Sequence, residues 1–228
     1  MIILKYEIVY FDLDNTLLDF SKSEKVALKR AMKRYGRTID EKTYELYEKI
    51  NEKWWSYFSQ GKYKKDFIVV ARFNEFFEAA GINDGNPELT SKEYLDELSR
   101  LAFFMPGAKK TLEYLKQKGQ RMAVITNGVE RVQQGRSKKV NLDSFIEFVL
   151  TSERVGKPKP EPKIFFEASK LSGVPLEKSI YIGDNPESDL QGAQRAGIAF
   201  ILFDSNGKAE EVDCTVAKSF EEIINLIE

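Results

Sequence analysis

The 228-residue sequence has no histidine and only one cysteine, Cys214. Without histidine, the chain cannot form a Ser-His-Asp triad, a histidine zinc site or a histidine general base. A single cysteine excludes an internal disulfide framework and a cysteine-rich zinc site, and it is in keeping with a reducing cytoplasm. Carboxylates, lysine, hydroxyl groups and a bound metal are the groups left for catalysis.

Long apolar runs and a strong excess of one charge are absent as well. No apolar run reaches about 18 residues and the first residues lack a signal-peptide pattern, so we expect a cytoplasmic protein that does not act at a membrane. The formal net charge is -1, which provides no electrostatic footprint for a nucleic acid polymer. Nothing in the sequence indicates an obligate protein partner.

A β-branched and aromatic run over residues 8–11 predicts a buried strand that ends at two carboxylates. The following residues, up to about residue 103, repeat apolar side chains at helical spacing in four segments without any strand pattern. Strand and helix patterns then alternate, so we predict an α/β fold with a parallel sheet and an all-helical insertion. The later strands are predicted at residues 122–126, 148–150, 179–184, 200–203 and 214–216.

Polar residues gather where four of these strand segments end. Because the carboxyl ends of parallel strands share one edge of the sheet, we expect their side chains to converge on one pocket. The four groups are Asp12 with Asp14, then Thr126-Asn127-Gly128, then Lys159 in the loop after the third strand, and finally Gly183-Asp184 with Asp189.

This set of residue types favours phosphoryl chemistry. A carboxylate can attack phosphorus directly to form an aspartyl-phosphate, and Asp12 is the predicted nucleophile. Asp14, on the same face two residues later, is predicted to protonate the leaving oxygen and then to deprotonate the attacking water. Thr126 and the backbone N–H groups of Asn127 and Gly128 are expected to bind phosphoryl oxygens, while a lysine neutralises the charge that develops in transfer.

A divalent cation is expected among the acids, because neighbouring carboxylates repel each other and oxygen ligands suit Mg²⁺. We predict that Asp12 and Asp14 bind the metal from the first strand end and that Asp184 completes its carboxylate set. Asp189 is expected to orient the lysine or a metal-bound water.

The motifs D-L-D-N-T, I-T-N-G, K-P-E-P and G-D-N-P-E-S-D resemble those of the haloacid dehalogenase-like (HAD) superfamily, and the resemblance covers essentially the whole chain. It implies a Rossmann-like catalytic core from residues 1–17 and 104–228, with a helical C1 cap from residues 18–103. It also implies Mg²⁺-dependent phosphatase chemistry in which Asp14 touches the metal through its backbone carbonyl. The dehalogenases that gave the family its name usually lack the second acid of the first motif, so Asp14 favours a phosphatase.

The catalytic lysine has two candidates, because residues 156–165 contain two Lys-Pro pairs where the family has one. The family pattern places Lys-Pro-acid-Pro just before an Ile-Phe helix start, which matches Lys159. Lys157 stays open as the alternative.

Features of the insertion resemble the pyrimidine 5'-nucleotidases of this superfamily, namely Asn51, Trp55 and Arg72 followed by Phe73, together with the T-N-G-V sequence that starts at Thr126. We expect Trp55 to lie at the cleft between cap and core, where it could stack on a nucleobase. The expected partner is a small phosphomonoester. Nucleoside 5'-monophosphates rank first, and sugar phosphates and phosphoglycolate rank next. A dehalogenase, a phosphomutase and a non-catalytic binding protein are the remaining alternatives.

Three other groups of residues have structural interpretations. Phe73, Phe76 and Phe77 recur at helical spacing, which is typical of the core of the insertion. The basic run at residues 62–65 is interpreted as a solvated turn. The basic residues Arg131, Arg136, Lys138 and Lys139 are interpreted as the solvated face of a helix.

Overall fold

Residues 5–207 and 212–228, which this computed structural model describes, contain one six-stranded sheet. All neighbouring strands are parallel, in the order β3-β2-β1-β4-β5-β6, which confirms the predicted α/β class. Residues 1–4 and 208–211, which belong to the core predicted from the sequence, lie outside the described residues. The strands are β1 (Ile8–Phe11), β2 (Arg121–Thr126), β3 (Val149–Thr151), β4 (Ser179–Gly183), β5 (Ala199–Phe203) and β6 (Thr215–Ala217).

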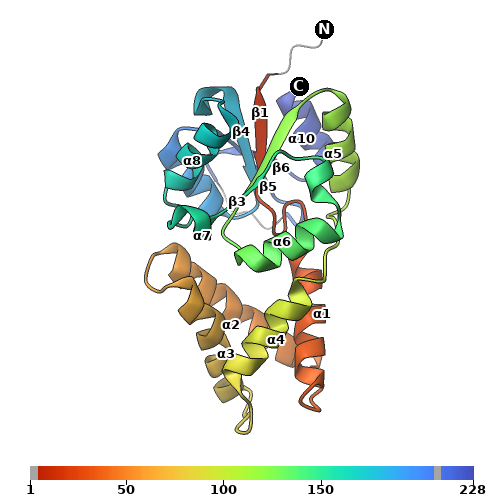
Figure 1. The fold of residues 1–228 in the computed structure, drawn as a ribbon, viewed down its shortest axis with the longest axis vertical. Helices are drawn as coiled ribbons and strands as arrows, with labels where there is room; N and C mark the ends of the chain where they lie inside the picture. Colours follow the sequence, from red (N-terminus) through yellow and green to blue (C-terminus); the bar gives the residue numbers. More distant parts are fainter. Residues whose placement is uncertain (1–4, 208–211) are drawn as a thin grey trace.

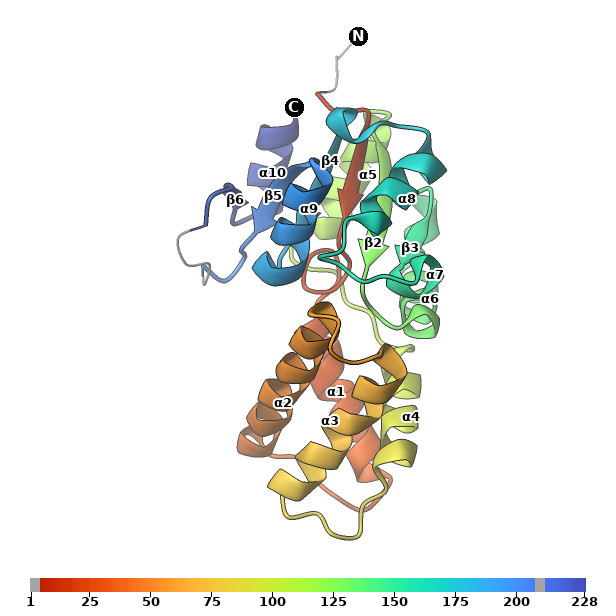
Figure 2. The ribbon, with the colours of Figure 1, turned by 90° about the vertical axis from the view of Figure 1, so that its left-hand side faces the viewer.

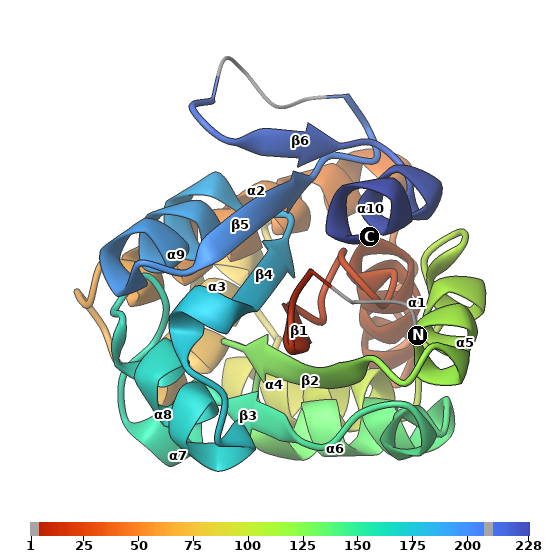
Figure 3. The ribbon, with the colours of Figure 1, turned by 90° about the horizontal axis from the view of Figure 1, so that it is seen from above.

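The central strand β1 is buried on both faces of the sheet. Ile8 and Tyr10 pack into one apolar cluster, and Val9 and Phe11 pack into another on the opposite face. A parallel strand covered on both faces needs such an unbroken apolar run. Two helices, α5 (Ala108–Gln117) and α10 (Phe220–Ile227), cover one face, while α8 (Lys163–Ser172) and α9 (Gln191–Ala196) cover the other (Figure 3).

One further helix and several short turns complete the core. Helix α6 (Glu130–Lys139) follows β2, and a single helical turn, α7 (Ser152–Val155), follows β3. A π-helical turn, η3 (Pro186–Leu190), comes directly before α9. Such turns are uncommon and are found frequently at functional sites. Two 3₁₀ turns, η1 (Leu142–Ser144) and η2 (Leu176–Lys178), connect the remaining elements.

The first four of the five helices between β1 and β2 form a cap that lies beyond the C-terminal ends of the strands (Figures 1 and 2). No strand occurs between residues 20 and 98, all of which are described, so the predicted all-helical insertion is confirmed. Within the described residues, no helix is both long and apolar enough to cross a membrane. The cap helices are α1 (Phe20–Lys33), α2 (Glu41–Ser59), α3 (Lys65–Ala79) and α4 (Pro87–Leu98).

Aromatic side chains hold the cap together. Phe73, Phe76 and Phe77 are buried in one apolar cluster, as their spacing predicted. The ring of Tyr47 from α2 lies 5.3 Å from the rings of both Phe73 and Phe76, and the contact with Phe76 is edge-on. Rings at this separation stabilise a core beyond the area that they bury.

The chain leaves the core and returns to it at one place. Leu18 and Phe104 form an antiparallel bridge, and the backbone N–H of Asp19 donates to the carbonyl of Phe103 over 2.9 Å. The two connections between cap and core therefore lie side by side. They fall beside the predicted domain boundaries at residues 17/18 and 103/104, which stay a prediction.

Candidate active site

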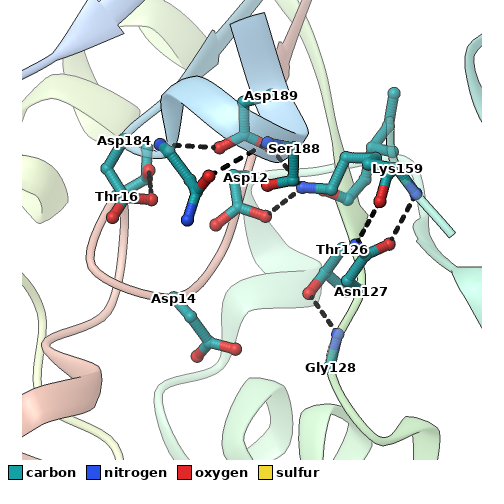
Figure 4. Close-up of polar contacts among 12 residues, drawn as sticks. Asp12, Asp14, Thr16, Thr126, Asn127, Gly128, Lys159, Asp184, Ser188 and Asp189 are labelled. Atoms are coloured by element: carbon teal, nitrogen blue, oxygen red, sulfur yellow. Dashed lines mark hydrogen bonds and ion pairs between the residues drawn. The ribbon is translucent and has the colours of Figure 1, made fainter. Parts of the chain in front are cut away.

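Three neighbouring strands deliver polar residues to one edge of the sheet (Figure 4). Asp12 directly follows β1, Thr126 is the last residue of β2, and Asp184 directly follows β4. The N–H of Asp12 donates to the carbonyl of Ile182 over 2.8 Å, so the pairing of β1 with β4 continues up to the first acid. β2 and β4 flank β1 on opposite sides, so the order of strands in the sheet reverses direction at β1. Open α/β sheets bind ligands beyond the carboxyl ends of the strands at such a point.

The loop after β1 has a local reason for its sequence. Asn15 has a φ of 57°, in the left-handed region that asparagine tolerates better than most residues. From there its side-chain oxygen accepts the N–H groups of Phe20 (3.0 Å) and Ser21 (3.2 Å), which fixes the start of α1. Thr16 donates its hydroxyl to Asp184 over 3.3 Å and so ties this loop to the end of β4.

Lys159 lies at the centre of the polar group and is only 2% exposed. Its ammonium group donates to Asp12 Oδ1 and to Asp189 Oδ1, each over 2.6 Å, and to the hydroxyl of Tyr181 over 2.7 Å. Burial alone would lower the pKa of Lys159, but the two carboxylates outweigh it and hold this pKa above its usual range. Lys157 is exposed, so the structure brings Lys159 and not Lys157 to Asp12.

The side chain of Asn127 holds the loop that carries this lysine. Its amide nitrogen donates to the carbonyl of Lys159, and its amide oxygen accepts the N–H of Lys159, each over 2.9 Å. The sequence pointed only to the backbone of Asn127 as a phosphate ligand, and this second use of the side chain was missed. The N–H of Gly128 donates to Thr126 Oγ1 over 3.0 Å.

Three carboxylates face this one ammonium group. Oxygen atoms of Asp12, Asp184 and Asp189 all lie within 4.8 Å of one another. Burial raises the pKa values of Asp12 and Asp184, and the neighbouring anions raise them further. The excess of negative charge and the all-oxygen donor set fit a hard divalent cation.

Asp12 and Asp184 are better suited to hold such a cation than Asp189 is. Both oxygens of Asp189 are already in use: Oδ1 accepts from Lys159 and Tyr181, and Oδ2 accepts the N–H of Asn185 over 3.1 Å. This geometry suits a residue that orients the lysine. Gly183 allows the Asp189 carboxylate to lie against the end of β4, because a Cβ atom at residue 183 would lie 2.4 Å from Asp189 Oδ2.

The carboxylate of Asp14 lies apart from this group (Figure 4). Gln133 donates to Asp14 Oδ2 over 2.6 Å, and Arg136 forms an ion pair with Asp14 Oδ1. Both partners come from α6, and Arg136 is completely buried. The expectation that Arg136 faces solvent was therefore wrong. Its neighbours Arg131, Lys138 and Lys139 are exposed as expected.

Comparison with known proteins agrees with this geometry. The sequence profile of the haloacid dehalogenase-like hydrolases matches residues 9–203. The chain belongs to this family. The superfamily resemblance, and with it the prediction of a hydrolase, is confirmed.

Relatives with assigned activities span nearly the whole chain. The sequence is 36% identical over 218 residues to a glyceraldehyde 3-phosphate phosphatase of Pyrococcus furiosus, covering 92% of this chain and 85% of the relative. It is 30% identical over 200 residues to the pyrimidine 5'-nucleotidase PynA of Streptococcus pneumoniae, covering 87% and 84%. Among solved structures, the HAD-hydrolase YfnB of Bacillus subtilis, bound to magnesium, matches with a TM-score of 0.90 and 25% identity, covering 98% and 99% of the two chains.

In this HAD-like hydrolase, a cavity of about 650 Å³ extends from the carboxylates to the cap. Trp55 lines the cavity. Its neighbour Trp54 turns elsewhere and donates its indole N–H to Glu75 over 3.0 Å. Adjacent residues on a helix point about 100° apart, so only one of the two tryptophans can face the site.

Buried polar side chains from three cap helices also line the cavity. Arg72 donates to Asn51 Oδ1 over 2.6 Å, and Asn51 donates to Glu24 Oε1 over 2.7 Å. None of the three is more than 4% exposed. Polar groups this deeply buried need partners, and they account for the polarity of the cap side of the cavity.

Lys65 connects the cap with the core and corrects the interpretation of the basic run at residues 62–65. Lys62, Tyr63 and Lys64 are exposed, but Lys65 is buried. Its ammonium group donates to the carbonyl of Gly128 and to Ser152 Oγ, each over 2.9 Å. It also pairs with Glu153. A lysine at the start of a cap helix thus lies against the loop that follows β2.

The buried carboxyl of Glu24 predicts a pH-dependent stability. Burial raises its pKa to about 8, against about 4.3 for an unfolded glutamate. A raised native pKa means that the stability it contributes is complete below about pH 4 and is lost as the pH rises through 8. We therefore expect the free energy of unfolding of the wild type to fall relative to that of Glu24→Gln as the pH rises from about 5 to 8. The difference between the two proteins should grow by up to about 1.4 kcal/mol per pH unit.

Urea unfolding at several pH values measures this difference. Glu41→Gln is the matched control, because Glu41 lies in the same cap with a side chain that is 62% exposed, and its difference from the wild type should stay flat. A flat difference for Glu24→Gln would show that its carboxyl is charged in the folded cap.

Proposed function

We propose that this chain is a Mg²⁺-dependent phosphomonoesterase that acts on a small phosphorylated metabolite through an aspartyl-phosphate. The contact that carries the proposal is the one between the ammonium group of Lys159 and the carboxylate of Asp12, 2.6 Å apart in a buried pocket. A nucleophilic carboxylate beside a fixed cation is what in-line attack on a phosphate dianion requires. The phosphatase and nucleotidase names of the relatives support the same chemistry.

The reaction proceeds in two steps. An oxygen of Asp12 attacks phosphorus, the bond from phosphorus to the ester oxygen breaks, and Asp14 gives its proton to the departing oxygen. A water molecule then attacks the phosphorus of the aspartyl-phosphate and passes a proton to Asp14. The bond from phosphorus to Asp12 breaks, which releases inorganic phosphate and restores both acids.

The remaining residues bind and orient the phosphate. Thr126 and the N–H groups of Asn127 and Gly128 lie at the end of β2 beside Lys159, where the threonine hydroxyl and the two N–H groups would donate hydrogen bonds to phosphoryl oxygens. Lys159 neutralises charge on the transferred group, and Asp189 keeps this lysine in place.

The carboxylates of Asp12 and Asp184 would hold the Mg²⁺, with the backbone carbonyl of Asp14 as a further oxygen donor. Mg²⁺ in this position supplies positive charge that reduces the repulsion between the phosphate and the nucleophile. Magnesium in the related YfnB structure supports this assignment.

A nucleoside 5'-monophosphate is the proposed substrate. The cavity of about 650 Å³ is within the range of roughly 300–1,000 Å³ that small-molecule sites occupy. Its lining by Trp55 and Arg72 combines an aromatic face with a buried guanidinium group, whose Nη2 has no hydrogen-bond partner among the described residues and would donate to a carbonyl group of a base. The likeness to the nucleotidase PynA supports this choice. Glyceraldehyde 3-phosphate is the second candidate, because the Pyrococcus relative named for it is 36% identical.

The roles of the two acids can be separated by trapping the phosphoenzyme. Asp12→Asn is expected to form no phosphoenzyme, because the nucleophile is gone. Asp14→Asn is expected to form it from p-nitrophenyl phosphate, whose leaving group needs no proton, while turnover falls by about 10²–10⁴. Acid quenching of a radiolabelled substrate measures both. Equal trapping in the two variants would contradict this division of roles.

The two lysines of the Lys-Pro pairs form a second matched pair of variants. We expect Lys159→Ala to lose about 10²-fold or more in kcat/KM on p-nitrophenyl phosphate, because the cation beside the transferred group is removed. Lys157→Ala should keep wild-type activity, since Lys157 is exposed. Phosphate release is the measurement, and the reverse result would move the catalytic role to Lys157.

Substrate choice can be tested with the adjacent tryptophans. Wild-type enzyme should prefer UMP and CMP over glyceraldehyde 3-phosphate, ribose 5-phosphate and phosphoglycolate. Trp55→Ala should lower kcat/KM for the nucleotides by about tenfold, because it removes an aromatic contact worth about 1.5 kcal/mol. The kcat/KM for phosphoglycolate should stay unchanged. Trp54→Ala, the control, should leave the ratio between substrates unchanged. If glyceraldehyde 3-phosphate is the best substrate, the nucleotide assignment is wrong although the phosphatase chemistry stands.

A further inference from the structure

Arg136 occupies an unusual position for an arginine. It is completely buried at the end of α6, where its guanidinium group forms the ion pair with Asp14. Its Nε donates to the carbonyl of Leu101 over 3.2 Å, and the group lies 5.6 Å from the centre of the Phe20 ring. Phe20 begins the cap and Leu101 belongs to the segment that returns from it. The arginine therefore contacts Asp14 and both connections between cap and core.

Gln133 completes the contact from one turn earlier on α6. Its amide nitrogen donates to Asp14 Oδ2 over 2.6 Å and lies 3.3 Å from Thr126 Oγ1, and its amide oxygen accepts from Arg136 over 3.2 Å. Gly128 leaves room for it, because a Cβ atom at that position would lie 1.8 Å from the Gln133 amide nitrogen. Each oxygen of Asp14 thus has its own donor.

A structural role alone would be met by any acid beside Arg136, because a buried guanidinium group needs an anionic partner. Here the partner is an acid that lines the cavity with a side chain 25% exposed, and Gln133 bonds its other oxygen. The ion pair of Arg131 with Asp96 already links α6 to α4 at the surface. Breaking a buried charge pair is costly, so Arg136 and Asp14 constrain each other strongly.

We propose that Gln133 and Arg136 are positioning residues that hold the carboxylate of Asp14 in place for its proton transfers. The proposal rests on the proposed function, because it assigns these residues to the acid and base of that reaction. Asp14 follows a loop and would otherwise sample several rotamers, so two fixed donors raise the fraction of molecules in which it is correctly placed. Because Arg136 also binds Leu101, the placement depends on the cap being seated on the core.

The test compares two esters that differ in their need for a proton. kcat/KM covers the steps up to departure of the leaving group. In Arg136→Gln we expect kcat/KM on ribose 5-phosphate to fall by about 10–100-fold, part of the roughly 10²–10⁴ that general acid catalysis contributes. On p-nitrophenyl phosphate kcat/KM should change by less than about threefold, while kcat falls and a burst of p-nitrophenol appears, because the attack of water still needs Asp14.

Further variants separate positioning from damage to the fold. Gln133→Leu should also lose more kcat/KM on ribose 5-phosphate than on p-nitrophenyl phosphate, but to a smaller extent than Arg136→Gln. Arg136→Lys should recover part of the loss, since a lysine offers one point charge in place of a planar fork. In the Asp14→Asn background Arg136→Gln should have no additional effect. Arg131→Gln is the matched control from the same helix and interface, and it should behave as the wild type.

Three results would overturn the proposal. Equal losses on both esters in Arg136→Gln and Gln133→Leu would indicate a general structural role for α6. Unchanged kinetics in both variants would show that Asp14 needs no such support. A higher KM on both esters with kcat retained would make Arg136 a substrate-binding residue. Full activity of Asp12→Asn would instead refute the underlying phosphatase mechanism, so the two failures are distinguishable.

Discussion

The cluster of one buried ammonium group with two buried carboxylates and a third, partly buried one is the constraint on which the rest of this structure depends. Lys159 offsets part of the charge of Asp12 and Asp189, and Asp184 adds a further negative charge within 4.8 Å of them. Such a cluster is costly to bury unless its charge is balanced. A phosphate dianion can enter only if more positive charge enters with it, which is why a divalent cation and a phosphoryl substrate are expected together.

The fold assembles this cluster from segments that are far apart in the chain. Parallel strands β2, β1 and β4 end at the same edge, so Thr126, Asp12 and Asp184 arrive there without any special loop. The lysine is the exception, because it comes from a loop beyond β3. Asn127 fixes that loop through two hydrogen bonds with the backbone of Lys159. The position of Lys159 beside Asp12 therefore depends on an amide that bonds the backbone of Lys159.

Sequence patterns predicted the parts of this arrangement that are local or repeated. The unbroken run of β1, the helical spacing of Phe73, Phe76 and Phe77, and the motif order gave the α/β class, the helical insertion and the family. The interpretation of Arg136 and Lys65 failed for a common reason. Both are basic residues among other basic residues, and such runs usually face solvent. Here each one is covered by the other half of the molecule, which periodicity along a single helix cannot register.

The failure at Arg136 also shows how the two halves share one site. Helix α6 belongs to the core by connectivity, yet Val132 packs in the apolar cluster of the cap and Gly135 allows α6 to approach Ser99 closely. The helix therefore faces the cap, the returning segment and Asp14 at once, so its apolar pattern is weak and three of its polar residues, Gln133, Arg136 and Ser137, are buried. A polar side chain buried against two partners is held by both of them. It follows that α6 is the element through which seating of the cap and placement of Asp14 are linked, whereas Asp12 and Lys159 are held by the core alone.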